Sequence, residues 1–412
     1  MKRAVITGLG VVSPLGSNLK VFTEHLQAGH SGVRRIESFD VADYGSQIGG
    51  EVTGFDPNDY VSKKEQRRMD DYSQYAIGGA KMAIEDAGLD ITSEDQDRIG
   101  VVIGSGVGGL KTLEKQHTIL MQKGPSRCSP FMIPEMILNM ASGLIAIEFD
   151  FRGPNYSTVS ACASAAHAIG DCLNIIRNGE ADIMISGGSD AAVSPLGVGG
   201  FCALKALSKR NDEPEKASRP FDAERDGFVI AEGAAILVIE ELEHAKRRGA
   251  SIYCEVAGCG MTCDAFHMTA PREDGSGAAK AMKLAMKDAG VNPDDIDYIN
   301  AHGTSTQLND KMETKAIKLA LGEDLARKVM VSSSKSMTGH LLGAAAGIES
   351  AVCALIIRDG VVTPTINYET PDPECDLDYV PNTARETKVK ACLNNSLGFG
   401  GHNASLAFTS VE

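Results

Sequence analysis

The sequence predicts an α/β protein made of two similar halves, residues 1–250 and 251–412. Three observations predict it. Similar segments recur in the same order in both parts, helical segments end at glycine and lead into strands, and the strands are apolar throughout. Such strands belong to sheets that helices cover on both faces. Recurrence in a fixed order indicates a duplicated structural unit.

Four pairs of segments define the duplication. An apolar strand ending in G-x-G opens each half, and a helix stopped by glycine follows with a strand after it. Two further pairs of segments resemble each other less closely. The first half carries the larger insertions. The pairs are "AVITGLG" (4–10) with "CEVAGCG" (254–260), "AKMAIEDAG" (80–88) with "AMKLAMKDAG" (281–290), "NIIRNGEADIMI" (174–185) with "LIIRDGVVTPTI" (355–366), and "GFVIAEGAAILVI" (227–239) with "LGFGGHNASLAF" (397–408).

Composition excludes several classes of function. A net charge of -15 argues against nucleic acid as a partner. The most apolar segment, 341–357, is barely long enough to cross a membrane and contains Glu349, so we expect a buried helix there. Ten cysteines at irregular spacings favour free thiols in a reducing cytosol, and the chain starts without a signal peptide pattern. We therefore expect a cytoplasmic protein.

Cys162 is the first candidate for chemistry. In "YSTVSACASAAHAIGDCLNIIRNG" a strand runs to about Ser160, and a helix follows that ends at Gly179. Unpaired N–H groups and the dipole at a helix N-terminus favour a thiolate. Buried structural cysteines are also common, so the residue type alone leaves both interpretations open. His167 lies five positions on, about 140° around the helix, and we expect a structural or interface role for it.

His302 and two threonines form a second candidate group. His302 ends an apolar strand in "NAHGTSTQLND", where the carboxyl ends of strands face ligands in α/β sheets. Thr304 and Thr306 follow it. They are suited to hydrogen-bonding a polar, extended substrate, to capping the next helix, or to both.

A third group lies in "SSSKSMTGHLLGAAAG", 332–347, before the expected buried helix. Lys335 suits an exposed loop, whereas His340 fits poorly in such an apolar setting. Glu349 needs a partner when its helix is buried, and Lys335 is available.

Two further segments are candidates for contacts with a ligand or a partner. In "NNSLGFGGHNASLAF", 394–408, glycines around Phe399 could bring backbone N–H groups close to a ligand or simply form a tight turn. In "SKKEQRRMDD", 62–71, a basic patch on an acidic protein indicates either an acidic partner or a solvated face. The patch consists of Lys63, Lys64, Arg67 and Arg68.

Together these motifs resemble the β-ketoacyl-[acyl carrier protein] synthases of the thiolase-like fold, above all the elongating enzymes of dissociated fatty acid synthesis. The resemblance covers essentially the whole chain. It implies a five-layered αβαβα fold, a homodimer, and a decarboxylative condensation of an acyl thioester with malonyl-acyl carrier protein. It implies no cofactor of the enzyme itself, because the acyl carrier protein carries the phosphopantetheine. The motifs are "VITGLGVVSPLG", "SACASAAHAIG", "SRPFDAERDGFVIAEGA", "DAFHMTAP", "NAHGTSTQLND", "SKSMTGHLLGAAAG" and "NSLGFGG".

The resemblance also assigns roles to residues. Cys162 would carry the acyl chain, His302 and His340 would stabilise the malonyl-derived enolate, and Phe399 would gate the site and share the oxyanion hole. Lys335 and Glu349 would form a supporting ion pair. The remaining assignments are pantetheine and substrate contacts at Thr304, Thr306 and Gly400, an acyl pocket at Val107, Met132 and Phe201, a carrier-protein patch at Lys64, Arg67 and Arg68, and a monovalent-cation site at Asn300, Asn394, Asn395 and Glu349.

Three alternatives are weighed against this. A thiolase would need a second cysteine in a Cys-x-Gly context, and Cys392 in "KACLNN" lacks it. A chain-length-factor-like subunit would lack the nucleophile, whereas Cys162 is present. A dehydrogenase would rest on "GSGVGG" at 104–109, which no strand ending in an acid follows, and we interpret that segment as a close-packed turn. The sequence differs from the residues that are common in the family at Ser160, Ser164 and His402. None of these three side chains is expected to contact the reacting atoms.

Overall fold

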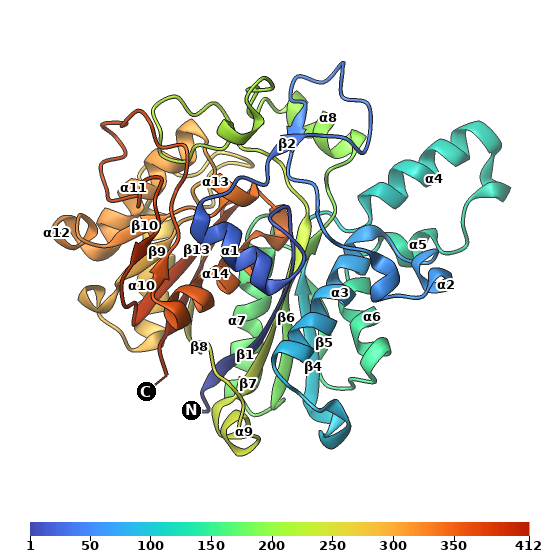
Figure 1. Cartoon of the computed structure of the whole chain (residues 1–412), viewed down its shortest axis with the longest axis horizontal. Coiled ribbons are helices and arrows are strands. Elements are labelled where there is room, and N and C mark those ends of the chain that lie inside the picture. Colours follow the sequence, from blue (N-terminus) through green and yellow to red (C-terminus); the bar gives the residue numbers. More distant parts are fainter. Residues whose placement is uncertain (412) are drawn as a thin grey trace.

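The central feature of the fold is a ten-stranded sheet made of two five-stranded halves that meet edge to edge (Figure 1). The computed structural model describes residues 1–411. The first half runs β5-β4-β6-β7-β1 and the second runs β8-β14-β13-β9-β10, so the second order mirrors the first. The strands are β1 (Ala4–Val12), β4 (Ile99–Gly104), β5 (Asn155–Thr158), β6 (Ile183–Asp190), β7 (Gly233–Glu241), β8 (Cys254–Cys263), β9 (Tyr298–Asn300), β10 (Met330–Ser332), β13 (Ala391–Gly398) and β14 (His402–Thr409).

The two halves also share strand directions. In each half the three strands farthest from the junction are parallel to one another: β5, β4 and β6 in the first half, and β10, β9 and β13 in the second. The remaining neighbours within each half pair antiparallel. The halves join where β1 pairs antiparallel with β8 over 4–6 and 254–256. The carboxyl ends of the parallel strands β4 and β9 therefore open onto the loops that carry the candidate residues of both halves.

Helices complete five layers, as the family resemblance implies. α7 (Ser164–Arg177) and α14 (Ala345–Asp359) pack between the two half-sheets, since each contacts strands of both. α3 (Asp71–Asp86) and α6 (Met140–Phe149) cover the outer face of the first half. α10 (Ser276–Ala289) and α11 (Gln307–Leu321) form the outer layer of the second half.

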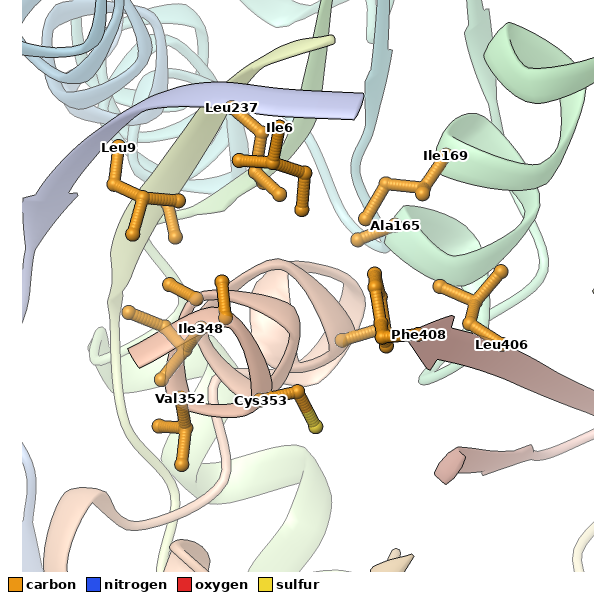
Figure 2. Packing of buried hydrophobic residues seen from close by; sticks show 14 of the residues in the cluster. Ile6, Leu9, Ala165, Ile169, Leu237, Ile348, Val352, Cys353, Leu406 and Phe408 are labelled. Carbon is orange, nitrogen blue, oxygen red and sulfur yellow. The ribbon is translucent and has the colours of Figure 1, made fainter. Parts of the chain in front are cut away.

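Small residues let these layers approach closely. Gly10 of β1 faces the backbone of α3, and a Cβ at Gly10 would overlap the carbonyl oxygen of Gly79. Figure 2 shows the centre of the molecule, where side chains of β1, β7, α7, α14 and β14 meet. Ile348 and Phe408 are fully buried there. Each side chain of that size contributes roughly 1.5–3 kcal/mol when buried.

The remaining elements connect and decorate the layers. One predicted pairing is wrong in part: segment 355–366 matches the end of α7 in its helix, but its strand is only the two-residue β11, which pairs with β12 outside the main sheet. Its place in the sheet is taken by β13, farther along the chain. The other elements are α1 (Leu19–Ala28), β2 (Arg34–Arg35), β3 (Ile48–Gly49), α2 (Lys63–Gln66), α4 (Leu110–Lys123), α5 (Met132–Met136), α8 (Pro195–Ala203), α9 (Leu242–Arg247), α12 (Glu323–Ala326), α13 (Lys335–Thr338), β11 (Val361–Val362) and β12 (Arg385–Glu386).

The apolar segment 341–357 is the buried central helix α14 with the turn before it. Within residues 1–411, none of the helices combines the length and the apolar character that crossing a membrane requires.

Candidate active site

Cys162 lies on a sharp turn between β5 and α7. Ala161 adopts φ 53°, a left-handed conformation that is uncommon for alanine and turns the chain abruptly. Ser164 stabilises the turn, because its hydroxyl accepts from the Ser160 N–H at 2.9 Å and donates to the Ala161 carbonyl at 2.7 Å. α7 begins at Ser164, so Cys162 precedes the helix instead of starting it. The predicted helix start was two to three residues too early.

Two histidines from the second half meet this cysteine. His340 Nε2 lies 3.0 Å from Cys162 Sγ. The His302 and His340 rings stand at 85° with centroids 5.4 Å apart. One nitrogen or sulfur from each of the three side chains lies within 4.8 Å of the others, and all three residues are buried. The fold thus brings together groups that are far apart in the sequence.

His167 points away from the sulfur. Its Nδ1 lies 2.5 Å from Ser160 Oγ, and its ring meets His402 at a centroid distance of 6.3 Å. Helical geometry predicts this separation from Cys162.

A buried ion pair lies behind His302. The Lys335 ammonium donates to the Glu349 carboxylate, and both side chains are 2% exposed. Lys335 Nζ also lies 3.4 Å from His302 Nδ1. An ammonium is only a donor, so His302 Nδ1 must accept and its proton must sit on Nε2. The lysine therefore sets the tautomer of His302.

Burial sets the protonation states of the site. Desolvation, together with the nearby Lys335 charge, lowers the pKa of both His302 and His340 well below 6.5, so both rings are neutral N–H donors at neutral pH. Desolvation raises the pKa of the Cys162 thiol to about 12, although Lys335 and the Phe399 N–H oppose this shift. The resting group is therefore the neutral thiol, because burying the thiolate charge costs more than Lys335 and the Phe399 N–H recover.

The glycine-rich loop approaches the cysteine through its backbone. The Phe399 N–H is directed at Cys162 Sγ. A Cβ at Gly398 would lie 2.6 Å from the Ser160 carbonyl oxygen and 3.2 Å from the Cys162 nitrogen, so only glycine permits this approach. Gly400 adopts φ 90° and donates its N–H to the Met268 carbonyl at 2.7 Å.

A cavity of about 560 Å³ leads to the three side chains. Val107, Phe201, Phe228 and Leu342 provide apolar wall, and Phe228 packs edge-on against His340 at a centroid distance of 5.3 Å. Polar residues stand in the same cavity, where the Thr304 and Thr306 hydroxyls lie 3.0 Å apart. Thr306 also caps α11, which confirms the capping role, and its contact with a substrate stays a prediction.

Two predicted contacts lie outside this cavity. Met132 begins α5 and Gly400 lies in the glycine-rich loop, and neither is among the described residues that line the cavity. The acyl-pocket contact of Met132 and the substrate contact of Gly400 therefore stay predictions. Their predicted contacts depended on motif position alone, which does not specify the direction in which a loop turns.

The basic patch lies on and just after α2, where Lys64, Arg67 and Arg68 are exposed. The Arg68 guanidinium stacks over the Phe131 ring at 4.7 Å. The patch is separate from the buried site and free to contact another molecule.

The four residues of the predicted cation site are buried, but they are not equally suited to a cation. Among residues 1–411, Asn300 Oδ1, Asn394 Oδ1 and Glu349 Oε2 are buried oxygens without a hydrogen-bond partner. Such orphaned oxygens are suitable ligands for a monovalent cation. Asn395 is less available, because its Oδ1 accepts from Ser405 Oγ at 2.9 Å.

Sequence reasoning missed Glu313. Its carboxylate accepts the backbone N–H groups of His302 and Gly303, each at 2.8 Å, and burial raises its pKa to about 7 despite those bonds. Glu313 thereby holds the turn that carries His302. The one available signal was an acid among the apolar residues of "DKMETKAIKLAL", 310–321, in the helix that follows the two threonines.

Family models and known relatives match the chain along its length. The model of the β-ketoacyl synthase N-terminal domain matches residues 1–245, and that of the C-terminal domain matches residues 253–369. The chain is 54% identical to 3-oxoacyl-[acyl-carrier-protein] synthase 2 of Synechocystis, over 100% of this chain and 99% of that protein. It is 51% identical to the same-named protein of Coxiella burnetii, with the same coverage.

Solved structures agree. A type II polyketide ketosynthase, described in complex with its acyl-carrier protein, is 38% identical, with a TM-score of 0.92 and 100% of both chains covered. A β-ketoacyl synthase from Burkholderia phymatum is 37% identical, also with a TM-score of 0.92 and full coverage of both chains.

Proposed function

Because the chain belongs to the β-ketoacyl synthase family, we propose that Cys162, His302 and His340 carry out the condensation that elongates fatty acids. The enzyme is an acyltransferase that joins an acyl thioester to malonyl-acyl carrier protein and yields 3-oxoacyl-acyl carrier protein, CO₂ and free acyl carrier protein. The observation that carries the residue assignment is the convergence of these three side chains within 4.8 Å beside an apolar cavity.

Acyl transfer to Cys162 is the first step. Sγ attacks the carbonyl carbon of the acyl thioester, and the thiol proton is transferred to the departing pantetheine sulfur. His340 Nε2, 3.0 Å away, donates its N–H to the negative charge that develops on Sγ. The C–S bond to the carrier breaks as the bond to Sγ forms. The backbone N–H groups of Cys162 and Phe399 stabilise the tetrahedral oxyanion. A neutral thiol beside a neutral imidazole suits this step, because the thiolate need exist only during the attack.

Decarboxylation of the malonyl group is the second step. The bond to the carboxylate breaks, CO₂ leaves, and the electron pair remains as an enolate whose oxygen accepts from His302 and His340. Neutral imidazoles donate to this oxygen without protonating it. Lys335 keeps the His302 proton on Nε2. The carbanion then attacks the carbonyl carbon of the Cys162 thioester, the C–S bond breaks, and the departing thiolate takes up a proton from water to restore the thiol.

The acyl carrier protein is the partner of this reaction. We infer that it docks at Lys64, Arg67 and Arg68, where exposed positive charge on an otherwise acidic protein attracts an acidic surface. We expect Thr304 and Thr306, whose hydroxyls lie 3.0 Å apart in the cavity, to hydrogen-bond the pantetheine arm. The enzyme itself needs no organic cofactor in this scheme.

A homodimer is also proposed. β5 ends the first half-sheet and pairs only with β4 within residues 1–411, which leaves one edge open for a second copy. Tyr156 and Val159 beside it are 39% and 58% exposed, as expected of side chains that a partner covers.

Three further assignments are proposals of the same kind. The halves divide at residues 250 and 251, between α9 and β8. A monovalent cation at Asn300, Asn394 and Glu349 would neutralise buried negative charge near the site. The location is cytoplasmic, which suits the ten free cysteines.

One experiment tests the reaction. The enzyme is incubated with acyl carrier proteins of graded acyl length and malonyl-acyl carrier protein, and the products are measured by mass spectrometry. We expect 3-oxoacyl-acyl carrier protein two carbons longer than the acyl donor. Release of acyl groups without any longer product would contradict the proposal.

A further inference from the structure

A second buried carboxylate stands beside the site. Asp190 is the last residue of β6 and is fully buried. Oδ1 accepts from Ser105 Oγ at 2.8 Å and from the Val107 N–H at 3.1 Å, and Oδ2 accepts from the N–H groups of Gly106 at 2.9 Å and Gly343 at 2.7 Å. Among the described residues no lysine, arginine or histidine pairs with it. Hydrogen-bond donors alone hold this charge.

The donors come from two segments that belong to different halves. Residues 105–107 follow β4 in the first half, and Gly343 follows α13 in the second half. Gly106, Val107 and Leu342 line the cavity, and His340 lies three residues before Gly343. The segments touch, because a Cβ at Gly343 would overlap the Gly106 nitrogen. The carboxylate thus bridges the cavity wall and the loop that carries His340.

We propose that Asp190 is a positioning residue that couples the wall of the acyl cavity to the placement of His340 against Cys162. The proposal rests on the condensing activity described above. A carboxylate suits this place because it only accepts, and four converging donors need an acceptor on every side. An amide of the same shape would turn an N–H₂ group toward two of these donors and force the two segments apart.

The test compares Asp190→Asn with Ser186→Ala. Ser186 lies on the same strand, is equally buried, and donates to the Val102 carbonyl at 3.0 Å, away from the cavity. Each purified enzyme is assayed for CO₂ release from malonyl-acyl carrier protein and for kcat/KM with acyl donors of graded length.

We expect Asp190→Asn to lower CO₂ release about 10- to 100-fold, since displacement of a catalytic group by about 1 Å has an effect of that size. Its order of preference among acyl lengths should change as well. Ser186→Ala should keep the wild-type order and rate. Wild-type rates and an unchanged length order in Asp190→Asn would overturn the proposal.

Ser105→Ala provides a milder variant that still tests the inference when Asp190→Asn does not fold. It removes one bond to Oδ1 and leaves the Gly343 bond intact. We expect its kcat/KM for the preferred acyl donor to fall about threefold relative to other lengths, with CO₂ release unchanged, since one buried hydrogen bond is worth a factor of that order. An unchanged length profile would overturn the inference. A wild-type enzyme that forms no condensation product would instead reject the proposed function.

Discussion

His340 Nε2 lies 3.0 Å from Cys162 Sγ, although 178 residues separate them in the chain. The contact spans the two halves of the molecule, since Cys162 precedes α7 and His340 precedes α14, the two central helices. Both helices pack in the middle layer, so the loops before them open into the same cavity. The chemistry of the site follows from this arrangement.

His340→Ala should lower CO₂ release from malonyl-acyl carrier protein about 10²- to 10³-fold, the usual effect of removing one donor to a developing oxyanion. Radiolabelled CO₂ measures it. His167→Ala is the matched control, because His167 contacts Ser160 and not the sulfur. Equal CO₂ release in the His340 variant would exclude this histidine from decarboxylation.

Cys162→Ala should abolish condensation and leave the fold intact. Alanine removes the only sulfur in the cavity-lining residues and creates little empty volume. Intact-protein mass spectrometry should show an acyl adduct on the wild type and none on the variant. Condensation at the wild-type rate would contradict the mechanism.

Glu349→Gln should destabilise the protein by about 3–5 kcal/mol, because it leaves the buried Lys335 ammonium without its counter-ion. Urea denaturation measures the loss. Glu24→Gln breaks the exposed Lys20–Glu24 pair and should change stability by no more than about 1 kcal/mol. Similar stabilities for the two variants would show that Lys335 is solvated.

The contribution of His302 to stability should fall as pH drops below 6.5. His302 has a folded pKa well below its unfolded value of 6.5, so below pH 6.5 the unfolded chain takes up a proton that the folded protein does not. The contribution is present above pH 6.5 and is lost on acidification, by up to about 1.4 kcal/mol per pH unit. His302→Gln should flatten the pH dependence of unfolding between pH 5 and 6.5. A slope identical to wild type would mean that His302 titrates normally.

Reversing the charge at Arg67 and Arg68 to glutamate should weaken binding of acyl carrier protein, and the loss should shrink as salt is added. Titration calorimetry at several salt concentrations measures it. The matched control reverses Lys246 and Arg247 on α9, which Figure 1 places beside the N-terminus. Equal losses in both double variants would indicate a general charge effect instead of a docking patch.

Much of the architecture could be predicted from the sequence. The echoes at 4–10 and 254–260 are β1 and β8, the two strands that join the half-sheets. The apolar run around Glu349 is a buried helix, and Lys335 is its partner. These predictions hold because the pattern of apolar residues along a segment already indicates which strands and helices are buried. A buried carboxylate also requires a nearby cation, whatever the rest of the fold. The helical spacing of Cys162 and His167 is local in the same way.

Other features were decided by the tertiary structure alone. Burial keeps the Cys162 thiol neutral, and this burial could not be read from the residues beside it because segments far along the chain exclude the water. Met132 and Gly400 lie outside the cavity because loop direction depends on what packs against the loop. Glu313 and Asp190 had no motif to mark them. Each became significant only when folding brought backbone N–H groups from other segments to a carboxylate that the sequence shows merely as one acid among many.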